Sequence, residues 1–233
     1  MVRKLTILLT TLIIGLLFIA ACSSQLTGNA VGADSCKSLK DAARDDCYFE
    51  SGQCSKIKKE SLRNACVAEL GIKKQDLTAC NLITSESAKG YCQSGVAASK
   101  NDVEICKTIE DRYWKDNCHF NYATDNQKGV FCAAINAKEQ QQDCFYEVAV
   151  DTNNPEFCDS LPDTRADQCL FAIARATKNI AFCDQIKIPL NIDVCRLKLA
   201  SKILMDKSLC ETIKAKAVKD VCLERFSEEV AEA

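Results

Sequence analysis

The chain has 233 residues, of which 30 are basic, 32 are acidic and 17 are cysteines, and its net charge is −2. This balance of charge argues against nucleic-acid binding, which favours a basic surface. The single histidine, His119, excludes a multi-histidine metal site within one chain, and the sequence contains no glycine-rich phosphate loop, G-x-S-x-G elbow or EF-hand loop.

Residues 1–21 have the pattern of an export signal peptide, because Arg3 and Lys4 precede an uncharged apolar run. Ile19-Ala20-Ala21-Cys22 follows as the end of this run and resembles the lipobox of prokaryotic lipoproteins. That resemblance implies cleavage before Cys22 and lipidation of its thiol. The alternative is an uncleaved N-terminal membrane helix, since the run is close to the shortest length that spans a bilayer.

Either form of attachment predicts a chain held at the cell membrane, with the remaining residues on the extracytoplasmic side, in the periplasm or at the cell surface. Residues 22–33 would then be the lipidated cysteine and a flexible tether, because they are small and polar and carry no charge. Residues 34–233 are expected to form a cysteine-rich helical repeat domain.

After Cys22 the cysteines fall into eight pairs, which define repeats 1 to 8 in chain order. The two members of a pair are 11 or 12 residues apart, and from Cys54 on the first member recurs every 25–27 residues. Ile or Leu always stands three residues after the first cysteine. From repeat 2 on, the fourth residue after the second cysteine is apolar or aromatic and the fifth is small. These spacings are typical of helix faces and unlike strand alternation.

Each repeat is expected to contain a short helix, a turn, and a longer helix that begins about six residues after the first cysteine. Asp or Asn stands four residues before the first cysteine in five repeats and is suited to capping the short helix: Asp76, Asp102, Asn154, Asn179 and Asp206. A second set of acids stands two residues before the second cysteine, where it would favour the early turns of its own helix: Asp45, Asp116, Asp167, Asp193 and Asp220.

Helices of about 8–12 residues are only marginally stable alone. Stacking of neighbouring hairpins would bury their apolar faces, and the small residues would let adjacent helices approach closely; a ligand groove is the alternative reason for these small residues. The sequence therefore predicts an all-α fold, an α-solenoid of about eight helical hairpins of ~26 residues.

Omitting Cys22 leaves an even number of cysteines, which in an exported chain indicates a disulfide framework. Antiparallel helices with a turn near the middle would bring the two cysteines of a pair to the Cα separation that a disulfide needs. The other option, linking neighbouring repeats, is less consistent with a long second helix. The expected disulfides are Cys36–Cys47, Cys54–Cys66, Cys80–Cys92, Cys106–Cys118, Cys132–Cys144, Cys158–Cys169, Cys183–Cys195 and Cys210–Cys222.

A metal or redox role for the cysteines is the alternative to disulfides. Zinc and iron–sulfur sites favour closely spaced Cys-x2-Cys pairs, and the sequence contains none. We therefore expect no metal and no cofactor.

Repeat 4 differs from the other repeats because it contains the only Trp and the only His of the chain. Aromatic and Arg side chains often anchor partners, so candidate partner contacts are Arg112, Trp114, His119 and Tyr122. The alternative for Trp114 is a core position between helices.

This organisation resembles, in architecture only, secreted cysteine-rich proteins of tetratricopeptide-like design, in which each helical hairpin carries one disulfide. The sequence signatures of that family are absent. The resemblance implies an extracytoplasmic scaffold that binds protein, peptide or glycan without catalysis. The alternative is a cell-envelope enzyme or polymer-remodelling factor that uses surface carboxylates.

Overall fold

The computed structural model describes residues 35–231, so the expected signal peptide, the lipidation site Cys22 and the tether over 22–33 lie outside the described residues. The described residues divide into two compact units, with the boundary between Cys66 and Val67. Every regular element in the described residues is a helix, which confirms the predicted all-α fold.

The described part of the first unit contains repeat 1 and most of repeat 2. Its elements are η1 (Ser35–Ser38), α2 (Asp41–Glu50), η2 (Cys54–Lys56) and the beginning of α3 (Glu60–Lys74). The connection between the two repeats is short and turns at Gly52, whose φ of 70° lies in the left-handed region that favours glycine.

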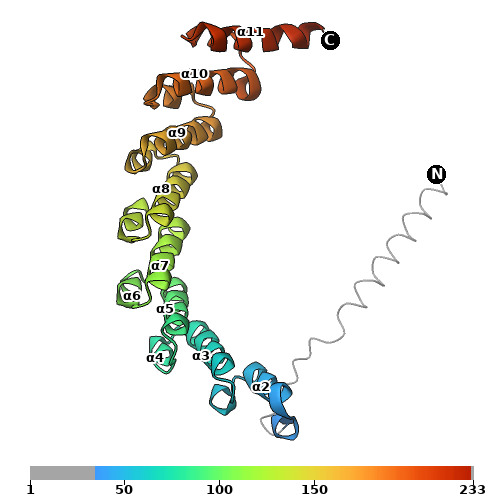
Figure 1. Cartoon of the computed structure of the whole chain (residues 1–233), viewed down its shortest axis with the longest axis vertical. Helices are drawn as coiled ribbons and strands as arrows, with labels where there is room; N and C mark the ends of the chain where they lie inside the picture. Colours follow the sequence, from blue (N-terminus) through green and yellow to red (C-terminus); the bar gives the residue numbers. More distant parts are fainter. Residues whose placement is uncertain (1–34, 232–233) are drawn as a thin grey trace, which may run out of the picture. The chain divides into compact units, whose positions relative to one another are not determined.

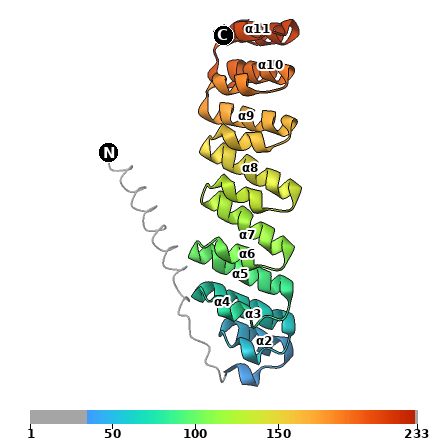
Figure 2. The same ribbon diagram turned by 90° about the vertical axis from the view of Figure 1, so that its left-hand side faces the viewer.

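The second unit continues from α3 and alternates short and long helices. The elements of the second unit are α4 (Leu77–Cys80), α5 (Glu86–Lys100), α6 (Glu104–Thr108), α7 (Arg112–Asp125), η3 (Gly129–Ala134), α8 (Lys138–Thr152), η4 (Pro155–Ser160), α9 (Asp163–Thr177), η5 (Ile180–Gln185), α10 (Pro189–Lys198), η6 (Leu199–Leu204), η7 (Lys207–Thr212) and α11 (Lys216–Ala231). The long helices α5, α7, α8 and α9 pack on one another in order (Figure 1 and Figure 2). The short helices α4 and α6 lie in a separate layer, to the left of α5 and α7 in Figure 1.

Each repeat carries one disulfide between its short and its long helix, which is the predicted pairing for all eight. The Cα–Cα distances are 5.5–5.7 Å. The bonded cysteines are buried except Cys47, which is half-buried. The Ile or Leu three residues after the first cysteine packs beside them in the core, and only Leu39 of repeat 1 is exposed. The disulfides and these aliphatic side chains therefore form the centre of each hairpin.

The first helix of each repeat is shorter than the expected 8–12 residues. Most of these helices are 3-10 turns of three to six residues. Each turn closes when the amide of the Ile or Leu donates to the carbonyl of the first cysteine, as Ile109 N does to Cys106 O at 3.3 Å. The chain is then extended, and the long helix begins six residues after the first cysteine, as at Arg112.

The junctions between repeats in the second unit share one backbone geometry. In each junction, the residue five positions before the next repeat's first cysteine has a left-handed backbone, with φ of 52–55°. These residues are Gln75, Asn101, Gln127, Asn153, Lys178 and Met205. The amide that follows donates back to the carbonyl of the small residue, as Asp102 N does to Ala97 O at 2.9 Å. The predicted caps are confirmed: Asp102 Oδ1, for example, accepts the amide of Glu104 at 3.0 Å.

One junction contains an extra residue, since 15 residues instead of 14 separate Cys195 from Cys210. The helix absorbs the insertion as the π-helical segment η6 (Leu199–Leu204). As a result the amide of Asp206 still reaches Ala200 O at 3.0 Å, and the next repeat begins in register.

The acids two residues before the second cysteine act differently from the expectation that they favour their own helix. Asp116, Asp167 and Asp193 are buried and accept backbone amides at the start of the long helix in the next repeat, and Asp45 does the same within the first unit. Their role is therefore to connect repeats.

A candidate binding surface between α5 and α7

Three aromatic side chains form one cluster, the aromatic cluster Tyr91, Tyr113 and Trp114. The ring of Trp114 lies 5.1 Å from the rings of both Tyr91 on α5 and Tyr113 on α7, in edge-to-face arrangements. The Trp114 Nε1–H donates to Ser87 Oγ at 3.1 Å, which fixes the indole against α5. A Cβ on Gly90 would lie 2.8 Å from the Trp114 Cβ, so the glycine provides the space that Trp114 occupies.

The aromatic cluster is accessible to solvent. Tyr113 is 65% exposed and Tyr91 is 42% exposed, while Trp114 is half-buried. Large side chains that combine an apolar body with a polar tip, such as Tyr and Trp, are enriched where proteins contact partners. The cluster is therefore a candidate contact surface, and Trp114 also fills space between the helices.

The structure separates the four residues that the sequence analysis grouped. Arg112 is exposed at the first turn of α7 and precedes Tyr113 in the sequence. His119 is buried, with 3% of its surface exposed, and is not accessible to a partner. Tyr122 is half-buried, and its ring packs edge-to-face on Phe131 at 5.0 Å. Of this group, only Trp114 belongs to the aromatic cluster.

Burial lowers the pKa of the His119 imidazole below its ordinary value, although the carboxylate of Asp116 acts in the opposite direction. Its Nδ1 has no hydrogen-bond partner among the described residues. His119 is thus held neutral inside the hairpin.

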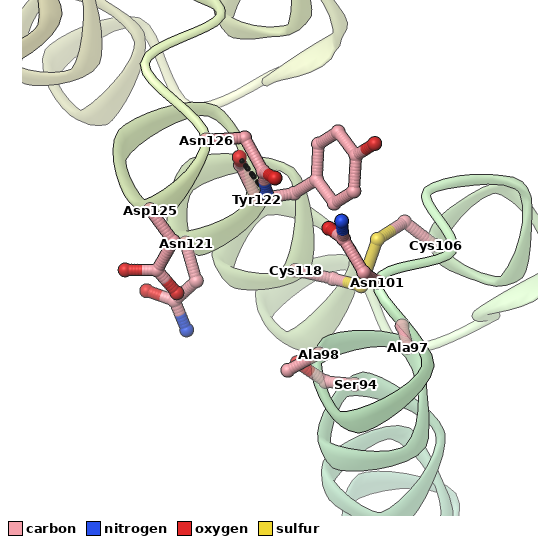
Figure 3. A pocket seen from close by; sticks show the side chains of 10 residues that line it. All are labelled: Ser94, Ala97, Ala98, Asn101, Cys106, Cys118, Asn121, Tyr122, Asp125 and Asn126. Carbon is pink, nitrogen blue, oxygen red and sulfur yellow. Dashed lines mark hydrogen bonds between the residues drawn. A yellow bond between two sulfur atoms is a disulfide. The ribbon is translucent and has the colours of Figure 1, made fainter.

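A recess of about 160 Å³ lies between the C-terminal halves of α5 and α7 (Figure 3). We call it the α5–α7 recess, and it is lined by Ser94, Ala97, Ala98, Asn101, Cys106, Cys118, Asn121, Tyr122, Asp125 and Asn126. In Figure 3 the side chains of Asn121 and Asp125 lie side by side on α7. Asn101 is at the end of α5, and its left-handed backbone places it at the rim.

Several polar groups of the α5–α7 recess have no intramolecular partner. Ser94 is 7% exposed, yet no hydrogen bond of its hydroxyl is found in the part of the chain that the structure describes. The same is true of the side chains of Asn101, Asn121 and Asp125, whereas Asn126 Nδ2 donates to Tyr122 O at 3.0 Å. Asn101, Asn121 and Asp125 are exposed, and only Ser94 is buried, so these donors and acceptors are open to water or to a ligand.

The aromatic cluster and the recess lie along the same pair of helix faces. Tyr91 precedes Ser94 by three residues on α5, and Trp114 precedes Asn121 by seven residues on α7. These are the helical spacings of one face, and two turns extend about 10.5 Å along the axis. We call the combined surface the α5–α7 seam.

The sequence analysis did not identify Tyr91, Asn101, Asn121 or Asp125, because none has a motif of its own. Tyr91 reaches Trp114 from the preceding repeat, and the recess residues meet only when α5 packs on α7. A signal was present, however: the repeat phase places Tyr91 and Trp114 on the long helices of adjacent repeats.

A second recess of about 260 Å³ lies between α9 and α10, and its main polar side chains already form hydrogen bonds within the protein. Both oxygens of its carboxylate, Asp167, accept backbone amides, and Asn191 Nδ2 donates to one of them at 2.9 Å. Lys198 Nζ lies 5.0 Å from the centre of the Phe171 ring, within cation–π distance.

Among residues 35–231, no cluster of three or more His, Cys, Asp or Glu side chains is placed to hold a metal ion. None of the helices in the same range has the length and apolar character needed to cross a membrane. The expected absence of a cofactor stays a prediction.

No protein-family model matches the chain, and no characterised protein or solved structure shows significant similarity to it.

Proposed function

We propose that this protein is a membrane-tethered, non-catalytic scaffold that binds protein, peptide or glycan outside the cytoplasm. The observation that carries the proposal is the α5–α7 seam, where an exposed aromatic cluster continues into a recess with unbonded polar side chains. Apolar anchors beside a few convergent polar groups are the usual composition of a binding site.

The eight disulfides indicate an oxidising environment, as found outside the cytoplasm. The finer assignment to a membrane comes from the sequence, in which the apolar run and Cys22 favour a lipid anchor or an N-terminal membrane helix. Two acyl chains would hold the protein firmly, since each buried methylene contributes about 0.8 kcal/mol.

The scaffold supports binding because its seam is ordered before a ligand arrives. The Cys106–Cys118 disulfide lines the recess and joins α6 to α7, and the Ser87 hydroxyl holds Trp114. A site that needs little ordering loses less free energy on association.

A catalytic role is the second candidate, and one observation favours it, the raised pKa of a carboxyl group on α8. Partial burial, and then the like charges of Asp143 and Asp151, raise the pKa of Glu147 on α8. A raised carboxyl pKa is a feature of general acids. These acids follow one another along a single helix, however, and Asp143 forms an ion pair with Arg165, so binding is the better supported function.

The test is to immobilise the full chain and to measure binding of arrayed peptides and oligosaccharides to wild type, Trp114→Ala and Leu190→Ala. Leu190 is 58% exposed on α10 and serves as a control for loss of exposed apolar surface. We expect Trp114→Ala to lose the bound ligand while Leu190→Ala keeps it, with thermal melts to show that both are folded. Equal binding by Trp114→Ala and wild type would exclude the seam as the site.

A further inference from the structure

We propose that the α5–α7 recess holds one ring of an uncharged glycan and that the adjoining sugar packs against Tyr91 and Trp114. This inference rests on the proposed function and names the chemical class of its ligand.

The unbonded side chains define what the ligand must supply. Asn101 and Asn121 each carry a donor and an acceptor, Asp125 only accepts, and the Ser94 hydroxyl does both. A ligand with several hydroxyls around its edge, which donate and accept, can pair with most of these side chains at once. A sugar ring has this arrangement. A peptide side chain brings only one or two polar groups, so it would pair with fewer of these side chains than a sugar ring does.

The size of the recess fits one ring. The recess has a volume of about 160 Å³. Pockets for drug-sized ligands begin near about 300 Å³. The recess is therefore filled by a single ring, and a longer glycan must continue along the seam.

The aromatic cluster lies where that continuation leads. Tyr91 precedes Ser94 by one turn of α5, about 4.5 Å along the helix axis. Tyr91 is 42% exposed and its ring contacts Trp114. The C–H face of a sugar packs favourably on the electron-rich face of such rings. The seam thus offers hydroxyl partners at one end and apolar contact at the other.

The charge of the recess favours an uncharged sugar. Asp125 is its only charged lining residue, and its carboxylate would repel an acidic sugar. The hydroxyls of a neutral ring can donate hydrogen bonds to the same carboxylate. Hydrogen bonds to an ionised acceptor are stronger than those between neutral groups.

The experiment uses the full oxidised chain in a detergent without a sugar headgroup, titrated with cellotriose, maltotriose, mannotriose and chitotriose. Trp114 is the only tryptophan, so its emission reports binding at the seam directly. We expect a saturable change with at least one of these neutral oligosaccharides, and isothermal titration calorimetry should give the same affinity.

Asn101→Gly is the decisive variant, and Asn153→Gly is its matched control. Both asparagines end a long helix with φ of 52–53°, where glycine is favoured, so both variants should fold. Only Asn101 lines the recess. We expect Asn101→Gly and Asn121→Ala each to weaken binding about three- to tenfold, and Asn153→Gly to bind like wild type.

The glycan inference is overturned if none of the four oligosaccharides gives saturable binding at millimolar concentration, or if Asn101→Gly and wild type have equal affinity. If a peptide from the arrays binds the seam instead, the ligand class is wrong while the proposed function stands. If neither class binds, both proposals fail.

Discussion

Asp116 in repeat 4 caps the long helix of repeat 5 through Ala137. Its Oδ2 accepts the amide of Ala137 at 2.9 Å, and its Oδ1 accepts the amide of Asn136 at the same distance. The side chain is 2% exposed, and Ala137 has no side-chain cap of its own. The start of α8 is therefore satisfied by a residue of the preceding hairpin.

Asp116→Ala should destabilise the second unit by about 1–3 kcal/mol, because two partly buried amides at the start of α8 lose a charged acceptor. Urea unfolding would measure the change, and hydrogen exchange should speed up at Asn136 and Ala137. Asp220→Ala is the control, since Asp220 has the same position in repeat 8 but is exposed and pairs with Lys216. An equal loss in the two variants would contradict the role in connecting repeats.

Gly90→Ala should displace Trp114, because the added Cβ would lie 2.8 Å from the Trp114 Cβ. Overpacking of this kind costs about 1–3 kcal/mol, and the tryptophan emission should shift to longer wavelength as the indole meets water. Gly95→Ala meets Ile72 instead. That control should lose stability with unchanged emission, and a shift of similar size in both would argue against a specific effect at Trp114.

The stability of the fold should fall as the pH drops below about 6.5, the ordinary pKa of histidine. Burial lowers the folded-state pKa of His119, so above this pH the imidazole is neutral in both states and contributes nothing. Below it the unfolded chain takes up the proton first, which favours unfolding.

His119→Gln should make the folding stability less dependent on pH below about 6.5. Thermal melts across a pH series would measure this change. The carboxylates act in a separate window. Backbone and side-chain donors lower the pKa of Asp45, Asp76 and Asp206, so the stability that they contribute is lost only as the pH falls below about 3.8 through their depressed values. An unchanged slope near neutral pH in His119→Gln would show that another group titrates there.

Replacing Cys106 and Cys118 together by serine should cost about 3 kcal/mol, the chain-entropy contribution of a loop of this length. Because every other disulfide is also confined to one repeat, peptide mapping should find the remaining pairs unchanged. New pairs between distant cysteines in the double variant would contradict independent repeats.

The sequence predicted the features that repeat. The cysteine spacing, with Ile or Leu three residues after the first cysteine, was enough for the hairpins, their disulfides and the start of helices such as α7. The caps at Asp102 and its equivalents were also evident, because capping depends on neighbours in the chain.

The features that were missed depend on contacts between repeats. Asp116 was assigned to its own helix because reasoning along one segment cannot see the next hairpin's amides. The left-handed junction residues include Lys178 and Met205, which carry no conformational signal of the kind that glycine gives. The recess likewise forms only when α5 packs on α7.

The confinement of each disulfide to a loop of 11 or 12 residues has a consequence for how the protein matures. As soon as the second cysteine of a repeat enters an oxidising environment, its correct partner is already there and is the nearest thiol behind it in the chain. Oxidation can therefore proceed hairpin by hairpin, in the order in which the chain is delivered. A protein with this many cysteines then has little need of an isomerase to correct distant mispairing.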